Sequence, residues 1–265
     1  MVLVTRNLKI YFAAVGLFAL WVGVWGYFFP THVDKAIPWL VPPLHAQFIG
    51  AIYFSATAFN IGGILARSYT DAKLAILVTS IWTGMLFVIS LFYLGEFDPM
   101  NKRVWFWFGA YIVYPLVGIG FLWRYRNVLE PTDGILLPGW VKSYFSFQGV
   151  VLIGLALALL FFPDAMLNLW PWKITRLLAQ IYSSPFLAYG VGSLMLGRQN
   201  AWHEVKVIVT AAFVFAILTL LASFIHIELF SFERIATWVW FGAFLSASIL
   251  LGWMTFTSIR DGVKK

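Results

Sequence analysis

Apolar residues gather in eight long runs that short polar connectors separate. The runs lie near 10–29, 45–66, 74–95, 105–123, 144–162, 179–197, 207–228 and 235–256. A helix needs about 20 consecutive apolar residues to cross the hydrocarbon layer of a bilayer. The pattern therefore predicts an all-α, polytopic membrane protein with eight transmembrane helices. No connector is long enough for a separate domain.

The pattern also repeats along the chain after 133 residues. Trp105-Phe-Trp-Phe-Gly-Ala110 is matched by Trp238-Val-Trp-Phe-Gly-Ala243, and the same shift places Phe28-Phe-Pro30 on Phe161-Phe-Pro163. Unrelated apolar segments do not share Trp and Pro in one register, so we infer a tandem duplication. The predicted units are a four-helix repeat over 1–130, a linker over 131–143 and a second four-helix repeat over 144–265.

The even number of helices in each unit predicts that both units insert the same way up. Two parallel repeats are then related by an axis along the membrane normal. Basic residues predict the side, because Lys and Arg gather in cytoplasmic connectors. Of the 18 basic residues, 12 fall on the side of the termini: Arg6, Lys9, Arg67, Lys73, Arg124, Arg126, Lys142, Arg198, Lys206, Arg260, Lys264 and Lys265. Both termini are therefore expected in the cytoplasm.

Composition agrees with a membrane protein and narrows the possible chemistry. Hydrophobic residues make up 62% and charged residues 11% of the chain, where a soluble domain carries about 25% charge. The net charge of +7 follows from the topology, and no basic run is long enough to follow a nucleic acid. Cysteine is absent, which excludes thiol chemistry. The apolar run after Arg6 and Lys9 reaches Pro30 without a small-residue cleavage site, so we expect a retained first helix.

No ionisable residue lies in the middle of a predicted helix. Because such residues mark ion and proton pathways in membranes, their absence argues against an ion-coupled transporter. The common catalytic motifs of hydrolases and metalloenzymes are missing as well. We therefore expect a protein without a catalytic or metal site, and more probably a non-enzyme than an enzyme.

Four polar residues are candidates for contact with a ligand or cofactor. Gln47 and Gln180 are related by the 133-residue shift, and each lies one turn inside a helix. They fit an interhelical hydrogen bond, or a contact to a lipid headgroup, a quinone carbonyl or a pigment. His45 and His226 fit a metal ligand of a haem or chlorophyll, or a bond to a neighbouring side chain. Neither histidine is duplicated, since Leu178 and Tyr93 stand at the equivalent positions.

Six tryptophans are expected at the membrane interface, where indole rings are enriched. They are Trp105, Trp107, Trp238, Trp240, Trp39 and Trp172. A wall that binds a pigment or lipid is the alternative interpretation of the paired Trp-x-Trp segments.

Each half also resembles the DoxX-like group of small four-helix bacterial membrane proteins. The likeness lies in a first helix that ends in Phe-Phe-Pro, an amphipathic connector, and a second helix of the form Ala46-Gln-Phe-Ile-Gly-Ala-Ile-Tyr53. It covers about the first half of each repeat, and the second copy has Ser183 in place of Gly50. The resemblance implies a bacterial cytoplasmic membrane protein and supplies neither an activity nor functional residues.

These observations favour a non-enzymatic subunit or scaffold of a larger membrane complex that contacts lipid or a hydrophobic cofactor. The expected partners are membrane lipids and other membrane protein subunits, and the expected bound group is a lipid, a quinone or a pigment. A carrier or flippase for a small lipophilic molecule is the alternative. An enzyme that acts on lipid is the least favoured class.

Overall fold

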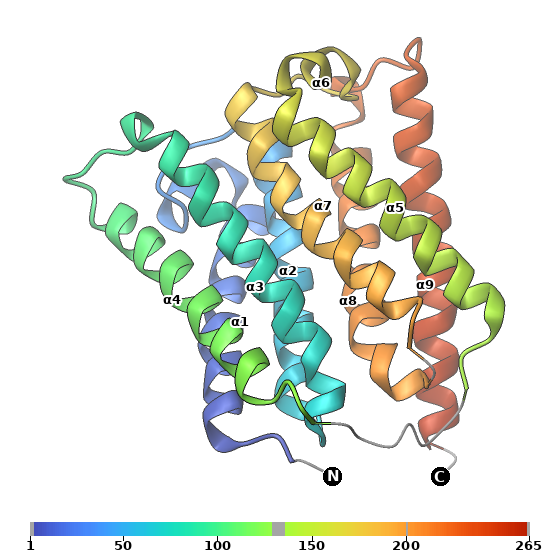
Figure 1. Cartoon of the computed structure of the whole chain (residues 1–265). Helices are drawn as coiled ribbons and strands as arrows, with labels where there is room; N and C mark the ends of the chain where they lie inside the picture. The colour runs from blue at the N-terminus through green and yellow to red at the C-terminus, as the bar shows by residue number, and fades with distance from the viewer. Residues whose placement is uncertain (1–2, 129–135, 200, 264–265) are drawn as a thin grey trace.

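The computed structural model describes residues 3–128, 136–199 and 201–263. The side chains of residues 204 and 258–263 lie outside this description. The described residues form nine α-helices (Figure 1): α1 (Arg6–Phe28), α2 (Pro43–Leu65), α3 (Tyr69–Phe92), α4 (Lys102–Arg124), α5 (Gly139–Phe161), α6 (Pro163–Leu169), α7 (Arg176–Leu196), α8 (Trp202–Ile225) and α9 (Ile235–Val263). Three short 3-10 helices lie between them: η1 (Pro30–Lys35), η2 (Leu94–Glu96) and η3 (Ile227–Leu229).

Seven helices of the described chain are long and apolar enough to cross a membrane, namely α1 to α5, α8 and α9. They fit an integral membrane protein. The helix α7 is not among them, although its 21 residues suffice in length. Its sequence carries Gln180, Ser183 and Ser184, all turned away from solvent. A span that faces other helices does not need an apolar surface all round, so the predicted eighth crossing remains a prediction.

The helices begin up to five residues before the apolar runs from which they were predicted. Lys and Arg have good helix propensity and extend their charged ends toward water, so the helical hydrogen bonds continue beyond the apolar core. For the same reason α5 begins at Gly139, within the span predicted as a linker. The earlier part of that predicted linker falls on residues 129–135, which lie outside the described residues.

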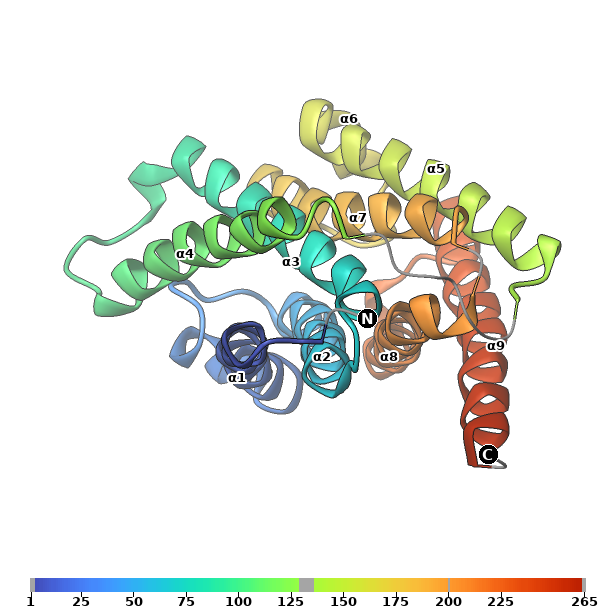
Figure 2. The same ribbon diagram turned by 60° about the horizontal axis from the view of Figure 1, so that its bottom comes forward.

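The bundle has an inner group of helices and an outer group. Within each half α1 packs on α2 and α5 on α7, while α3 packs on α4 and α8 on α9. The inner helices then cross between halves, because α2 packs on α8 and α3 on α7. Figure 2 shows α4, α5 and α9 on the outside of this group. These outer helices expose large apolar side chains, among them Trp105, Phe147 and Trp238.

The two halves point the same way in the structure. In Figure 1, α1 and α5 both run upward, while α4 and α9 both return to the lower end. The start of α1 and the end of α9 therefore lie at one end of the bundle, and the connectors with α6, η1, η2 and η3 lie toward the other. We call this second end the connector end.

Two glycines bring the backbones of α1 and α2 into direct contact. A Cβ atom on Gly50 would lie 2.5 Å from the backbone nitrogen of Tyr27, and one on Gly26 would lie 2.8 Å from the carbonyl oxygen of Ala46. Real side chains do not fit at such distances, so only glycine permits this approach. Leu159 and Ser183 stand at the equivalent positions of the second half. There α5 and α7 approach through Gly149 and Gly190 instead.

Candidate functional site

The two duplicated glutamines make equivalent pairs of hydrogen bonds at the connector end. Gln47 Nε2 donates to the carbonyl oxygen of Tyr27 at 3.1 Å, and His226 Nε2 donates to Gln47 Oε1 at 2.8 Å. Gln180 Nε2 donates to the carbonyl oxygen of Leu160 at 2.9 Å, and the Tyr93 hydroxyl donates to Gln180 Oε1 at 2.5 Å. Each side-chain amide therefore uses both its donor and its acceptor.

The partners show that each glutamine joins the two halves. The carbonyl partner lies at the end of the first helix of the same half, α1 or α5, whereas the side-chain partner follows the third helix of the other half, α8 or α3. We call the Gln47–His226 and Gln180–Tyr93 pairs the glutamine clamps. Burial raises the pKa of the Tyr93 phenol, which keeps the hydroxyl proton that Gln180 accepts.

The position of His226 differs in one respect from the sequence-based expectation. His226 and Glu228 were expected to point to different faces of one helix, but His226 Nδ1 lies 3.7 Å from Glu228 Oε1. The helix α8 ends at Ile225, and the following 3-10 turn brings the two side chains together. The sequence also gave no sign that Tyr93 would take the role of His226 in the other half, except that the two positions are 133 residues apart.

His45 anchors the connector of the second half. Its Nδ1 accepts a hydrogen bond from the Tyr182 hydroxyl at 2.7 Å and a longer one from Trp172 Nε1 at 3.5 Å. The ring also bonds the backbone of Lys173. His45 is buried, so the second-half connector is held by a side chain from the first half.

Neither candidate histidine presents a free face to a metal. Both rings bond protein groups, so a haem or chlorophyll metal would have to displace Tyr182 from His45 or Gln47 from His226. Within the described part of the chain, no group of three or more His, Cys, Asp or Glu could hold a metal ion. Pigment or haem binding by these residues remains a prediction.

The paired Trp-x-Trp segments each place one ring inside and one outside. Trp107 and Trp240 are buried, and their Nε1 atoms donate to Ser90 and Ser223 Oγ at 3.0 and 2.9 Å. Trp105 and Trp238 are more than 60% exposed, as an interfacial ring would be. Residues two apart in a helix point about 200° apart, so the spacing itself could have indicated this division. Of the other two candidates, Trp172 is buried and Trp39 is partly buried.

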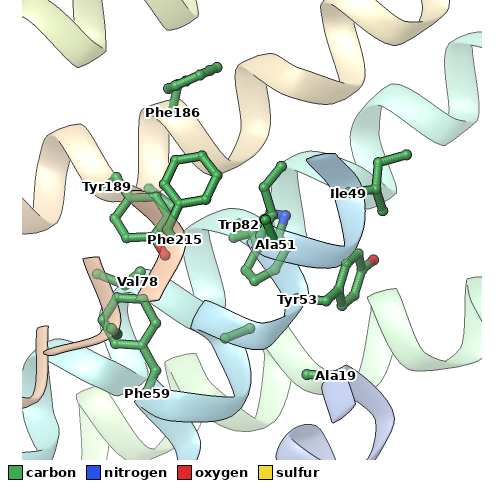
Figure 3. Close-up of a cluster of buried hydrophobic side chains, with 14 of the residues drawn as sticks. Ala19, Ile49, Ala51, Tyr53, Phe59, Val78, Trp82, Phe186, Tyr189 and Phe215 are labelled. Atoms are coloured by element: carbon green, nitrogen blue, oxygen red, sulfur yellow. The ribbon is translucent and has the colours of Figure 1, made fainter. Parts of the chain in front are cut away.

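Further bonds join the halves in the middle and at the end opposite the connectors. Ser55 Oγ hydrogen-bonds the Tyr189 hydroxyl and donates to the Ala211 carbonyl oxygen at 2.5 Å. His203 Nδ1 donates to Asp71 Oδ1 at 2.7 Å, although the sequence indicated a solvated His203 paired with Glu204. Figure 3 shows rings of both halves meeting beside these bonds, with Phe59 of α2 near Tyr189 of α7 and Phe215 of α8.

Two small cavities of about 20 Å³ each lie beside α2 in the first half. Tyr53 and Trp82, drawn in Figure 3, line both of them, and their ring centroids are 5.1 Å apart. The first cavity reaches the boundary with α7 through Tyr182 and Pro185. A volume of this size holds about one water-sized group, so neither cavity encloses a whole cofactor.

The Tyr182 hydroxyl can be tested as the bond that holds His45. We expect Tyr182→Phe to lower the free energy of unfolding by about 1 kcal/mol, the net value of one hydrogen bond. The measurement is SDS-induced unfolding in mixed micelles. In a His45→Leu background, where the acceptor is gone, the same substitution should cost much less. An equal cost in both backgrounds would show that the hydroxyl acts elsewhere.

Comparison with known proteins yields no relative: no family model, no curated protein and no solved structure matches this chain.

Proposed function

We propose that the chain is a non-enzymatic membrane scaffold in which two like-oriented four-helix repeats interlock into one rigid body. This body serves as a subunit of a larger membrane complex and contacts lipid or a hydrophobic cofactor. The observation that carries the proposal is the pair of glutamine clamps, since each half holds the third helix of the other through equivalent residues.

The helix boundaries support the duplication. The helices α1, α3 and α4 begin at Arg6, Tyr69 and Lys102, and α5, α8 and α9 begin 133 residues later at Gly139, Trp202 and Ile235. The helix α2 begins at Pro43, and its counterpart α7 begins at Arg176. This correspondence favours α7 as the eighth span. The repeats are then 1–130 and 144–265, with the linker over 131–143.

The bonds between the halves favour a scaffold over a carrier. A carrier that works by alternating access moves one repeat against the other and opens one end at a time. Here polar bonds cross between the halves at the connector end, in the middle and at the opposite end. Opening either end would break at least one buried or partly buried bond. The two small cavities are the observation that keeps the carrier for a small lipophilic molecule as the second candidate.

The outer surface supports contact with lipid and with other membrane subunits. The helices α4, α5 and α9 present apolar side chains outward along most of their length, including Leu116, Val150 and Ile249. The basic residues place both termini in the cytoplasm. The resemblance of each half to the DoxX-like group favours a bacterial cytoplasmic membrane.

The proposed orientation can be tested by labelling single cysteines, since the chain has no cysteine of its own. We expect Asp98→Cys and Ser231→Cys, which are 133 residues apart at the connector end, to react with a membrane-impermeant maleimide in intact cells. Lys9→Cys and Arg126→Cys should react only after the membrane is permeabilised. Labelling of Asp98→Cys and Ser231→Cys from opposite sides would refute the parallel arrangement.

The scaffold role is tested by purifying the full-length protein in mild detergent and recording its native mass. A stable complex with other membrane polypeptides, or a bound group with visible absorbance, is expected. If the purified protein instead carries no partner, and vesicles that contain it move a lipophilic solute faster than empty vesicles, the carrier replaces the scaffold.

A further inference from the structure

The indole N–H of Trp39 is buried at a cavity and lacks a hydrogen-bond partner. Among the described residues no acceptor bonds Trp39 Nε1, and Trp39 lines the cavity of about 20 Å³ that reaches α7. The ring centroids of Trp107 and Phe97 lie 4.9 and 5.5 Å from that of Trp39. Buried polar groups are nearly always bonded, so this unpaired donor requires an explanation.

The equivalent indole of the second half has its acceptor inside the protein. Trp172 lies 133 residues after Trp39, and its Nε1 donates to His45 Nδ1. The residue equivalent to His45 on the other side is Leu178, which offers no acceptor. One half therefore supplies the acceptor itself, and the other leaves the same donor open.

The space beside the indole also differs between the halves. Ile37 and Ile181 line the cavity of the first half, whereas the equivalent residues of the second half are Trp170 and Phe48. The centroids of these two rings lie 5.4 and 5.6 Å from that of Trp240. Large rings thus fill the second-half position that remains open in the first.

We propose that this cavity receives the carbonyl oxygen of a lipophilic molecule, with Trp39 Nε1 as the donor. An indole N–H only donates, so its partner must be an acceptor. A trapped water needs two to four polar partners, but the Tyr53 and Tyr182 hydroxyls at this cavity already bond Tyr111 and His45. A carbonyl oxygen needs a single donor, and the apolar wall of Ile37, Leu86 and Ile181 suits the carbon chain attached to it.

Two sources supply this chemistry, and the experiment separates them. The first is the acyl ester of a membrane lipid, and the second is a free lipophilic ketone. The inference rests on the proposed contact with lipid or a hydrophobic cofactor and on the duplication. It does not depend on partner subunits, so a protein that purifies without partners can still bind the carbonyl group.

The test observes the Trp39 indole directly by NMR of the full-length protein, labelled with ¹⁵N in its tryptophan indoles. The protein is placed in nanodiscs of a diether phosphatidylcholine, which has no acyl carbonyl, and the Trp39 signal is assigned by its loss in Trp39→Phe. We expect its indole proton to shift downfield when the lipid is replaced by the diester analogue, if a lipid ester is the source. If a free ketone is the source, the shift appears when undecan-2-one is added to the diether discs.

Variants connect the shift to the cavity. Ile181→Phe and Leu178→His, which copy the plug and the acceptor of the second half, should abolish the response to the carbonyl compound. Trp39→Phe should weaken binding roughly threefold to tenfold, the value of one hydrogen bond. Trp140→Phe, on the outer face of α5, is the control and should leave both the response and the affinity unchanged. No shift in either arm, or an undiminished shift in Ile181→Phe with the spectrum otherwise native, would overturn the proposal.

Discussion

Gly50→Val is expected to lower the free energy of unfolding by about 3 kcal/mol, at the upper end of the usual cost of overpacking. The new side chain would start 2.5 Å from the Tyr27 nitrogen and 2.9 Å from the Gly26 carbonyl carbon. These are backbone atoms, which cannot turn aside as a flexible side chain does. The helices α1 and α2 must separate, and Gln47 then loses the Tyr27 carbonyl oxygen that it binds.

The measurement is the folded fraction as a function of SDS in mixed micelles. Gly120→Val is the matched control, because a Cβ at Gly120 meets nothing within 4 Å and the residue is exposed on α4. The control should unfold like the unmodified protein. Similar losses for Gly50→Val and Gly120→Val would mean that the close approach of α1 and α2 contributes little to stability.

The second large effect is expected from removing both glutamine clamps. Gln47→Leu and Gln180→Leu each delete two hydrogen bonds and leave a buried or partly buried partner, His226 or Tyr93, without its acceptor. Interhelical bonds in membranes contribute about 0.6 kcal/mol on average, and an unpaired buried donor costs about 1–3 kcal/mol. We expect a loss of about 2 kcal/mol for each clamp, and the largest loss in the double variant.

A readout specific to the junction between halves distinguishes the clamps from general stabilisation. A protease site is inserted in the 131–135 segment, the chain is cut, and separation of the halves is followed against SDS concentration. The double variant should separate at lower SDS than the unmodified protein. Gln148→Leu, which removes a glutamine bonded only to Ser193 and Tyr144 of its own half, should not change that concentration. If it does so as much as the double variant, the clamps do not specifically join the halves.

The sequence predicted the elements well because lipid imposes a simple rule. A run of apolar residues long enough to cross a bilayer is read directly, and all-α architecture with membrane-crossing helices follows. The helix α7 departs from the rule because Gln180, Ser183 and Ser184 face other helices rather than lipid. A hydropathy pattern reports the surroundings of a helix, and those depend on packing that the pattern does not contain.

The candidate site was only partly accessible from the sequence. The 133-residue shift singled out Gln47 and Gln180, and both are bonded between helices in the structure. Their partners in the opposite half could not be predicted, because His226 and Tyr93 differ in chemistry and depend on α2 meeting α8 and α3 meeting α7. The open indole of Trp39 was likewise hidden, since its significance appears only when Trp172 is found bonded to His45.

The crossing of inner helices between halves has a consequence for biosynthesis. When the ribosome has delivered only the first four helices to the membrane, α2 and α3 have not yet met α8 and α7, on which they pack in the finished protein. Ser55 and Gln47 then wait in the bilayer without their later partners. A nascent chain that stops at this stage is an unfinished client for quality control, and maturation is completed only when the last helices arrive.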